Sequence, residues 1–471
     1  MTWLSTQFMP HAALAAGGLA VLGAGAAFKR PPKELLLGVS LAAVLCAGFF
    51  SGFGAWPPGT QSPMLAAGGL ERYFTVLVCA AAGLSMLLIH SYAQERGFSG
   101  DALYGLTLWA GLGMLITAQA ANLLLLAIGV ELMSLCLYAL IASRRNDPLA
   151  LEAALKYFLP GAVALAGIIF GVALVYAGTG EMDMMAALAR NSATASVGWT
   201  LILVGLGFKL SLAPVHLWTP DVYQGAPAPV TAFLSTGSKA AVAAVLLRLA
   251  LAAGWGQPAA VLQAAAALTM AAGSIAALSQ SSLKRLLAYS SIAQMGFVAM
   301  AVLSVRGGGE RAAMFSLGVY ALMELGAFGA VGLLSPDGSD RDILEDYRGM
   351  SYTHPWRAGL LALSLASLGG LPPTAGFIGK FVIFQAALNA GLYSLAVFGM
   401  LATIVGLYYC LRVLVTLYTP CPAGAEPERL PAGTPAETPG NLACMAVAAL
   451  LVAVGLYPAP LLEAVSALIL G

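Results

Sequence analysis

Charged residues are scarce in this chain: Asp, Glu, Lys and Arg together make up 9% of its 471 residues. That share is about a third of the roughly 25% that soluble domains contain. The formal net charge is only +1, which indicates no basic surface, so we expect no nucleic-acid partner. Hydrophobic residues account for 60% and recur in long runs from end to end, which indicates that lipid surrounds most of the chain.

Patterns that hold metals, nucleotides or redox groups are also missing. The six cysteines are scattered without CxxC spacing, mostly within apolar runs, where a thiol is usually a small apolar filler. The four histidines lie far apart in the sequence, which disfavours haem or metal ligation. No GxGxxG or Walker-type loop follows a strand pattern. We therefore expect no cofactor and no metal on this chain.

What the chain does contain is a series of about fourteen apolar runs, each close to the roughly 20 residues that cross a bilayer. They lie near residues 10–28, 35–53, 73–93, 102–119, 122–142, 157–178, 198–218, 229–252, 259–279, 284–304, 311–333, 357–388, 391–419 and 441–463. The short alternating segments of a membrane β-barrel are absent. The sequence therefore predicts an all-α polytopic membrane protein with about 14 transmembrane helices.

The distribution of Lys and Arg predicts the orientation. Alternate loops collect thirteen basic residues, Lys284 among them, against five, including Arg248, on the other side. We expect the first set to be cytoplasmic and both termini to lie on the opposite side of the membrane. No basic residue precedes the first apolar run, so we expect a retained span and not a cleaved signal. The polar loops at 335–354 and 420–441 are then cytoplasmic.

Four basic residues, all lysines, belong to neither of these loop sets: Lys156, Lys209, Lys239 and Lys380. An ammonium at the bilayer centre costs about 2.5–3.5 kcal/mol even on a lenient insertion scale, so such a group faces the protein interior or water and is usually functional. The alternative for the last three is a paired lysine that only locks helices together. Lys156 lies near the start of its run, where extension of the side chain to the membrane surface is an equal alternative.

Two acids are also placed in the membrane. Glu131 lies midway through the run 122–142, and Glu324 lies within the run 314–334. Burial disfavours the charged form of a side chain, whereas a nearby opposite charge favours it. A Glu131–Lys209 pair whose separation changes is therefore a proton switch, because withdrawal of the carboxylate promotes loss of the lysine proton. For each acid the alternative is a neutral or paired carboxyl that only packs helices.

Two of the runs contain breaks. One is Leu212-Ala213-Pro214, just after Lys209, and the other spans Leu368–Pro373, seven residues before Lys380. Proline removes a backbone donor and clashes with the preceding turn. Broken helices at corresponding places in two halves of a chain are typical of internally repeated transporters. The alternative, a loop between two ordinary spans, is disfavoured at the second break because its N-terminal flank is too short to cross alone.

Several weaker candidates for proton relay lie near these breaks. His216 follows the first break and titrates near neutral pH, although a structural helix-end histidine is equally consistent with its position. Gln294 and Tyr289, in the run 284–304, are polar groups that bind ordered water between charged sites.

The segments FKLSLAPVHLWTPDVYQGAPAPVTAFLSTGSK, LKRLLAYSSIAQMG, LGGLPPTAGFIGKF and ELMSLCLYAL closely resemble the antiporter-like membrane subunits of respiratory complex I. The resemblance covers residues 101–412. It implies two inverted five-helix repeats, each with one discontinuous helix. The implied divisions are three N-terminal helices in 1–100, the repeats in 101–252 and 253–419, and a cytoplasmic loop with a last helix in 420–471.

By this resemblance, the polar axis of the family falls on Glu131, Lys209, Lys239 and Lys380, with Lys156 at the start of the sixth span. It implies proton pumping within a translocase, an NADH:quinone oxidoreductase. The NAD, flavin, iron–sulfur and quinone sites are then on partner subunits, and this chain has no redox site. The implied partners are other membrane-arm subunits, including antiporter-like and small ones, together with lipids.

The chain departs from the family at two positions. Gln294 stands where a histidine is common, and glutamine cannot change its charge. Glu324 stands where an uncharged polar residue is expected, so we expect it to supply a compensating proton site. Two other function classes remain: a subunit of a multisubunit cation/proton antiporter or membrane-bound hydrogenase on the same module, and a structural membrane scaffold. The acid and lysine chain argues against the scaffold.

Overall fold

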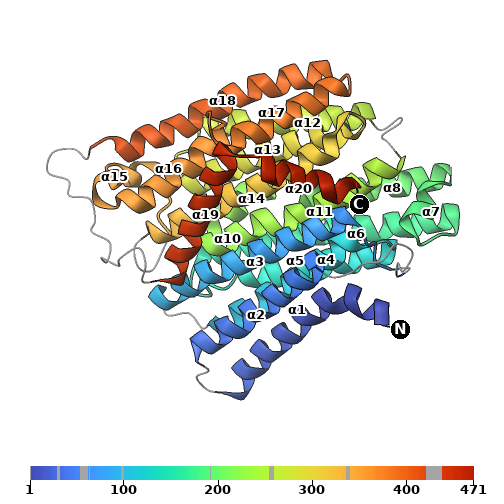
Figure 1. Ribbon diagram of the computed structural model, residues 1–471, viewed down its shortest axis with the longest axis horizontal. Helices are drawn as coiled ribbons and strands as arrows, with labels where there is room; N and C mark the ends of the chain where they lie inside the picture. Colours follow the sequence, from blue (N-terminus) through green and yellow to red (C-terminus); the bar gives the residue numbers. More distant parts are fainter. Residues whose placement is uncertain are drawn as a thin grey trace.

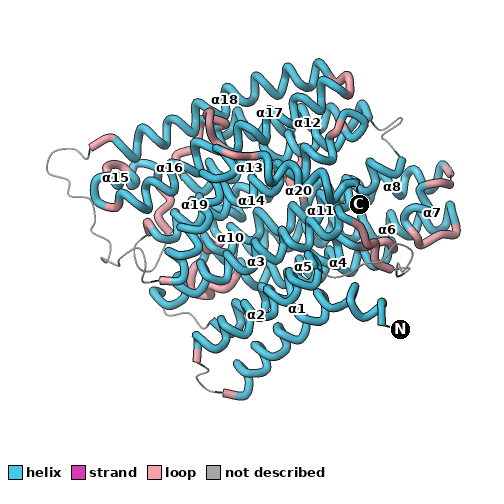
Figure 2. Tube along the Cα trace, viewed as in Figure 1, coloured by secondary structure: helices cyan, strands magenta, loops and turns pink. Residues whose placement is uncertain are grey.

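The chain folds into a layered bundle of helices that run roughly side by side (Figure 1). The computed structural model describes residues 2–28, 32–53, 62, 64–96, 100–190, 192–253, 259–335, 340–420 and 438–470. Figure 2 shows that helices joined by short loops make up nearly all of this described part, and its only β pairing is three isolated bridges. Most of the expected loop at 420–441 lies outside the described residues, as does part of the loop at 335–354.

Twelve helices of the described residues are long and apolar enough to cross a membrane. The two remaining predicted spans are the two divided ones, so the prediction of about fourteen is confirmed. The α-helices are α1 Thr2–Ala27, α2 Lys33–Phe53, α3 Gly69–Arg96, α4 Gly100–Gln119, α5 Leu123–Ile141, α6 Pro148–Thr179, α7 Met184–Leu188, α8 Ala193–Lys209, α9 Trp218–Gly225, α10 Ala228–Phe233, α11 Lys239–Ala253, α12 Ala259–Leu278, α13 Leu283–Leu303, α14 Gly309–Leu333, α15 Met350–Thr353, α16 Pro355–Gly369, α17 Ala375–Asn389, α18 Tyr393–Tyr418, α19 Pro439–Leu456 and α20 Ala459–Leu470.

Glycines set the close approach of the first two helices in each half. A Cβ on Gly113 of α4 would lie 2.4 Å from the Met133 backbone nitrogen of α5. In the second half, a Cβ on Gly273 of α12 would lie 2.5 Å from the Ala293 backbone nitrogen of α13. Lipid supplies no hydrophobic force between helices, so backbone contact through small residues is a main source of packing energy there. The two halves thus begin with helix pairs packed in the same way.

Both predicted breaks are present. α8 ends at Lys209 and α9 begins at Trp218, while α16 ends at Gly369 and α17 begins at Ala375. The peptide bonds Ala213–Pro214 and Pro372–Pro373, one in each break, are cis. Each half makes five crossings, from α4 to α11 and from α12 to α18, so the second half starts from the opposite membrane face and is inverted relative to the first.

The last span differs from its prediction. We expect one helix over residues 441–463, but α19 ends at Leu456 and a separate α20 follows from Ala459. Pro458 lacks a backbone donor and disfavours a helical conformation at Tyr457, which explains the interruption. Both helices pack on α3 and α14, and Figure 1 shows them in red across the face of the bundle.

Candidate functional site

Lys209 forms the last turn of α8, at the edge of the first break. Backbone N–H and C=O groups that have no helical partner at the break form hydrogen bonds with side chains. The N–H of Ala213 donates to the Thr269 hydroxyl at 2.8 Å, and the indole N–H of Trp218 donates to the Phe208 carbonyl at 2.9 Å. Non-helical backbone at membrane depth requires such partners, because lipid offers none. The break is therefore a defined structure that fixes the position of the lysine.

Aromatic rings surround the Lys209 ammonium. Its Nζ lies 4.6 Å from the ring centre of Tyr157 and 5.5 Å from those of Tyr138 and Phe208. It also lies 3.4 Å from the Tyr157 hydroxyl, and the side chain is among the largest that are fully buried. Each cation–π contact contributes about 0.5–2 kcal/mol when water is excluded. These three rings form an aromatic cage, which stabilises the ammonium without an anion in contact with it.

Glu131 lies on α5 and is partly exposed. No ion pair within 4.0 Å joins its carboxylate to Lys209 among the described residues, but the two charges act on each other through space. Tyr138, two turns later on the same helix, contacts the lysine directly. Direct pairing of Glu131 with Lys209 therefore remains a prediction, and the structure places an aromatic ring of α5 at the lysine.

Lys239 begins α11, directly after a π-helical segment formed by Leu234–Ser238. Single π-turns within helices occur frequently at functional sites. The side chain is 0% exposed, and its ammonium donates to the Ser291 hydroxyl. It also lies 5.4 Å from the ring centre of Tyr223 and 5.8 Å from that of Tyr320. The sequence predicts a buried lysine here but gives no sign of the π-segment.

Glu324 lies in the middle of α14 and is 0% exposed. Neither carboxylate oxygen has a hydrogen-bond partner among the described residues. Its electrostatic partner is Lys239.

Lys380 lies in α17 and bonds to the carbonyl end of α16 across the second break. Its Nζ donates to the Leu368 carbonyl at 2.9 Å and to the Gly369 carbonyl at 3.2 Å. Phe297 covers the ammonium at 5.3 Å from the ring centre. The amide of Gln294 donates to the same Leu368 oxygen at 3.0 Å. In transporters, the carbonyl groups at the end of a broken helix are typical ligands for cations. Here such carbonyls bind the ammonium of Lys380.

Helix α13 connects the Lys239 and Lys380 sites. Ser291, which accepts from Lys239, and Gln294, which shares the Leu368 oxygen with Lys380, both lie on this helix. Residues three apart share a helix face, so one face of α13 touches both sites. The structure therefore brings Gln294 to the Lys380 site.

Lys156 lies apart from this buried set. Helix α6 begins at Pro148 rather than near residue 157, which places Lys156 in its third turn. The ammonium pairs with Glu152 at 2.7 Å and with Asp221 at 2.8 Å, and 46% of the side chain is exposed. Asp221, to which the sequence assigns no role, links the helix start of α9 to α6.

His216 and Tyr289 are not brought to the buried lysines. His216 lies half-buried in the turn between α8 and α9. Tyr289 lies partly buried on α13 and packs against the hydrophobic core. Within the described residues, neither side chain forms a hydrogen bond or a cation–π contact with Lys209, Lys239 or Lys380.

The family model described as NADH:quinone oxidoreductase/Mrp antiporter, TM matches residues 120–406. NADH-quinone oxidoreductase subunit N 1 of Solidesulfovibrio magneticus is 51% identical over 480 residues, which cover 99% of each chain. Subunit N of Geotalea uraniireducens is 41% identical over 469 residues, covering 98% of each. The chain belongs to the NADH-quinone oxidoreductase subunit N family.

Solved structures agree with this assignment to the subunit N family. A chain of respiratory complex I from Thermus thermophilus, solved with bound aureothin, has a TM-score of 0.83 and 36% identity, and covers 97% of this chain and 99% of that one. A chain of the Mrp complex from Dietzia has a TM-score of 0.80 at 20% identity, with coverages of 98% and 94%, which shows a shared fold alone. The resemblance to the antiporter-like membrane subunits of respiratory complex I is confirmed.

This member of the subunit N family also contains, among its described residues, a fourth buried lysine that the sequence does not reveal. We count Lys284 among the cytoplasmic loop charges, but the structure buries it in an ion pair with Asp340 at 2.9 Å, with side chains 2% and 3% exposed. Its ammonium also donates to the Ala226 carbonyl at 2.6 Å. Asp340 is 56 residues away, so no local pattern predicts the contact. Arg248, expected in a loop on the other side, is likewise largely buried and pairs with Glu71 at 3.1 Å.

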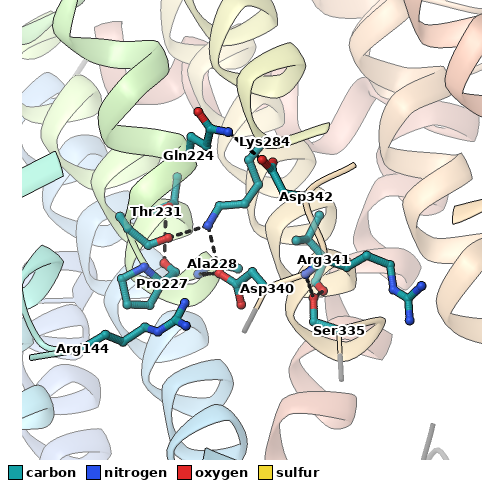
Figure 3. A network of polar contacts seen from close by, with 12 residues as sticks. Arg144, Gln224, Pro227, Ala228, Thr231, Lys284, Ser335, Asp340, Arg341 and Asp342 are labelled. Atoms are coloured by element: carbon teal, nitrogen blue, oxygen red, sulfur yellow. Dashed lines mark hydrogen bonds and ion pairs between the residues drawn. The ribbon is translucent and has the colours of Figure 1, made fainter. Parts of the chain in front are cut away.

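The Lys284 pair is part of a polar network that ties the first half to the second (Figure 3). Figure 3 shows the Lys284 side chain directed toward Asp340, with Gln224 directed toward Asp342. The Gln224 amide donates to Asp342 at 2.6 Å, and the Ala228 N–H donates to Asp340 at 3.0 Å. The network thus fixes α9 and α10 to the start of α13 and to the loop after α14.

Replacing Lys284 with methionine is expected to destabilise the subunit by about 3–5 kcal/mol, because it breaks the buried ion pair with Asp340. The measurement is the amount of subunit in the assembled complex and its thermal stability in detergent. Lys156→Met is the matched control, since removal of an exposed ion pair has little effect on stability. The double variant Lys284→Met/Asp340→Asn should recover part of the loss. Equal stability of the two single variants would contradict the assignment.

Proposed function

We propose that this chain is the proton-translocating membrane subunit of an NADH:quinone oxidoreductase, in which quinone reduction on partner subunits drives proton transfer through it. The observation that carries the proposal is the placement of three buried ammonium groups. Lys209, Lys239 and Lys380 each lie where a membrane helix is broken or distorted. A charge so costly in lipid is retained where it serves ion or proton transfer.

The proposed path runs from Lys209 through Lys239 to Lys380, which lies nearest the exit. Between the first two lysines, α9 places the rings of Trp218 and Tyr223. Between the last two, α13 supplies Ser291 and Gln294. Gln294 cannot carry a charge itself, so we assign it to holding the end of α16 beside Lys380.

Glu131 controls the first site in this proposal. Its carboxylate acts on Lys209 through space without direct contact, so a small movement of α5 relative to α8 changes the interaction. A closer carboxylate stabilises the ammonium, and a more distant one promotes release of its proton. Whether Lys209 keeps its proton then depends on the separation of α5 and α8.

The proposed divisions follow the sequence analysis: 1–100 for the N-terminal helices, 101–252 and 253–419 for the two repeats, and 420–471 for the loop and C-terminal region. Both termini are proposed to be periplasmic, and the multi-pass chain to lie in a bacterial inner membrane. Helix α6 exposes Leu155, Phe158 and Leu159 beside Lys156. We propose that a neighbouring membrane-arm subunit covers this face. NAD, flavin, iron–sulfur and quinone sites are assigned to partner subunits.

A second candidate function is cation/proton exchange in an antiporter complex. The chain would then be a subunit of that complex or of a related respiratory membrane complex. A chain of the membrane-bound sulfane sulfur reductase has a TM-score of 0.83 at 25% identity, which favours a module shared among such complexes. The neighbouring genes discriminate between the two: NADH-oxidising and quinone-site subunits support the first function, and antiporter partners support the second.

The test of the proposed function is the Glu131→Gln variant in the assembled complex, reconstituted into proteoliposomes. Because glutamine keeps the size but removes the charge, proton pumping is expected to fall roughly tenfold. This is less than the roughly 100-fold loss for removal of a proton-transfer group, since Glu131 acts on the Lys209 proton without carrying it. Pumping is measured by a pH-sensitive dye together with quinone reduction. Glu152→Gln on the exposed face of α6 is the matched control, with pumping expected to stay near wild type. Full pumping by an assembled Glu131→Gln complex would contradict the proposal.

A further inference from the structure

Glu324 is a buried acid without a direct partner. It lies in the middle of α14, is 0% exposed, and both carboxylate oxygens lack a hydrogen bond to any described residue. Nearly all buried polar groups in proteins have a hydrogen-bond partner. An acid that only packs helices would gain stability if an apolar residue of similar size replaced it. Its retention here requires a reason other than packing.

The polar groups around Glu324 form a cluster with Lys239. Lys239 donates to Ser291, whose hydroxyl is 2.6 Å from that of Tyr320. Tyr320 is four residues before Glu324 on α14, so the two side chains lie on one face of the helix. The Tyr223 hydroxyl, from α9, is 3.4 Å from Ser291. One hydroxyl-rich cluster therefore lies between the lysine and the face of α14 that carries the acid.

Other groups near Glu324 come from the surrounding helices. Its electrostatic neighbours are Lys239 from α11, Tyr223 from α9, and Tyr409 from α18. Ser235 of the π-segment also faces the carboxylate. Among these neighbours only Lys239 is a cation. Lys239 and Glu324 are thus the basic and the acidic group of this cluster.

We propose that Glu324 is the counter-charge of Lys239, so that the chain contains a second acid–lysine pair in addition to Glu131 and Lys209. In one state the pair is ammonium and carboxylate. In the other, an N–H bond of Lys239 is broken and an O–H bond of Glu324 is formed, with Ser291 and Tyr320 passing the proton, so both groups are neutral. This inference rests on the proposed function and adds a residue to its path.

The experiment compares two substitutions of Glu324. Which of the two loses more pumping shows whether Glu324 exchanges a proton or only packs α14. Glu324→Gln keeps the volume but cannot take up a proton, whereas Glu324→Asp keeps the carboxyl but leaves a gap of one methylene. If Glu324 exchanges a proton, pumping by the assembled complex falls roughly 100-fold in Glu324→Gln and stays within about twofold of wild type in Glu324→Asp. If Glu324 only packs α14, the order is reversed, and the proposal is overturned.

A second measurement detects the protonation state of the Glu324 carboxyl group directly. Infrared difference spectra of the complex, recorded between oxidised and reduced quinone, should contain a carboxyl C=O band that disappears in Glu324→Gln and shifts in Glu324→Asp. A structural acid would give no redox-linked band. The double variant Lys239→Met/Glu324→Gln should assemble better than Lys239→Met alone, because the single variant leaves an unpaired buried acid. Assembly no better in the double variant would overturn the pairing.

The test of the Glu324 role can fail without failure of the proposed function. Loss of pumping in Glu131→Gln with wild-type pumping in Glu324→Gln would overturn only this inference. Wild-type pumping in both variants would overturn the proposed function.

Discussion

Replacing Lys209 with methionine is expected to abolish most proton pumping by the assembled complex, with a loss of about 100-fold, as is typical when a proton-transfer group is removed. The aromatic cage holds this ammonium with Tyr157 as its nearest ring, and methionine packs equally well against aromatic rings. Assembly should therefore be retained, so that the loss reports the missing proton site. The measurement is the pumping rate per quinone reduced in proteoliposomes.

Lys209→Arg provides the sharper control. Arginine keeps the positive charge and stacks well on aromatic rings, but its guanidinium does not release a proton in proteins. If the lysine only locks helices together, arginine should restore much of the pumping. If the lysine releases its proton, arginine should be as inactive as methionine. Pumping restored by arginine would contradict the assigned role.

Replacing Lys380 with methionine is expected to cause a loss of pumping of about 100-fold as well. Lys380 is the proposed final site, and its two hydrogen bonds are to carbonyls at the end of α16. No other described cation contacts those carbonyls, so no neighbouring group substitutes for the lost proton site. The measurement is the same pumping assay, with the amount of assembled complex determined alongside it.

The control for this variant is Gln294→Met, which removes the other donor to the Leu368 oxygen without removing a charge. Loss of one neutral hydrogen bond costs about 1 kcal/mol of stability, so pumping should fall far less than in Lys380→Met. If Gln294→Met lost as much pumping as Lys380→Met, the decisive property would be the position of the α16 end and not the lysine proton.

Local sequence patterns predict the helices, the two breaks and three of the four buried lysines, because each of these features depends on neighbouring residues. Pro214 and Pro372–Pro373 remove backbone donors wherever they occur, and Lys209 lies within an apolar run in any fold. The division of the last span also has a local signal in Pro458. Each of these features follows from composition within about one helix.

The environment of each lysine could not be predicted in this way. Tyr157, the nearest ring to Lys209, is 52 residues away in the chain, and the partner of Lys284 comes from a loop after α14. Such contacts depend on the rotation of each helix about its axis and on which helices meet. The separation of Glu131 from Lys209 depends on the same packing.

The Lys380 site has a further consequence that follows from its ligands. The Leu368 and Gly369 oxygens belong to the backbone, so they neither gain nor lose protons, and no side-chain substitution removes them. Only a displacement of the α16 end relative to α17 changes their hold on the ammonium. In the proposed function, the proton on Lys209 therefore depends on the charged side chain of Glu131, whereas the proton on Lys380 depends on the position of the α16 end relative to α17.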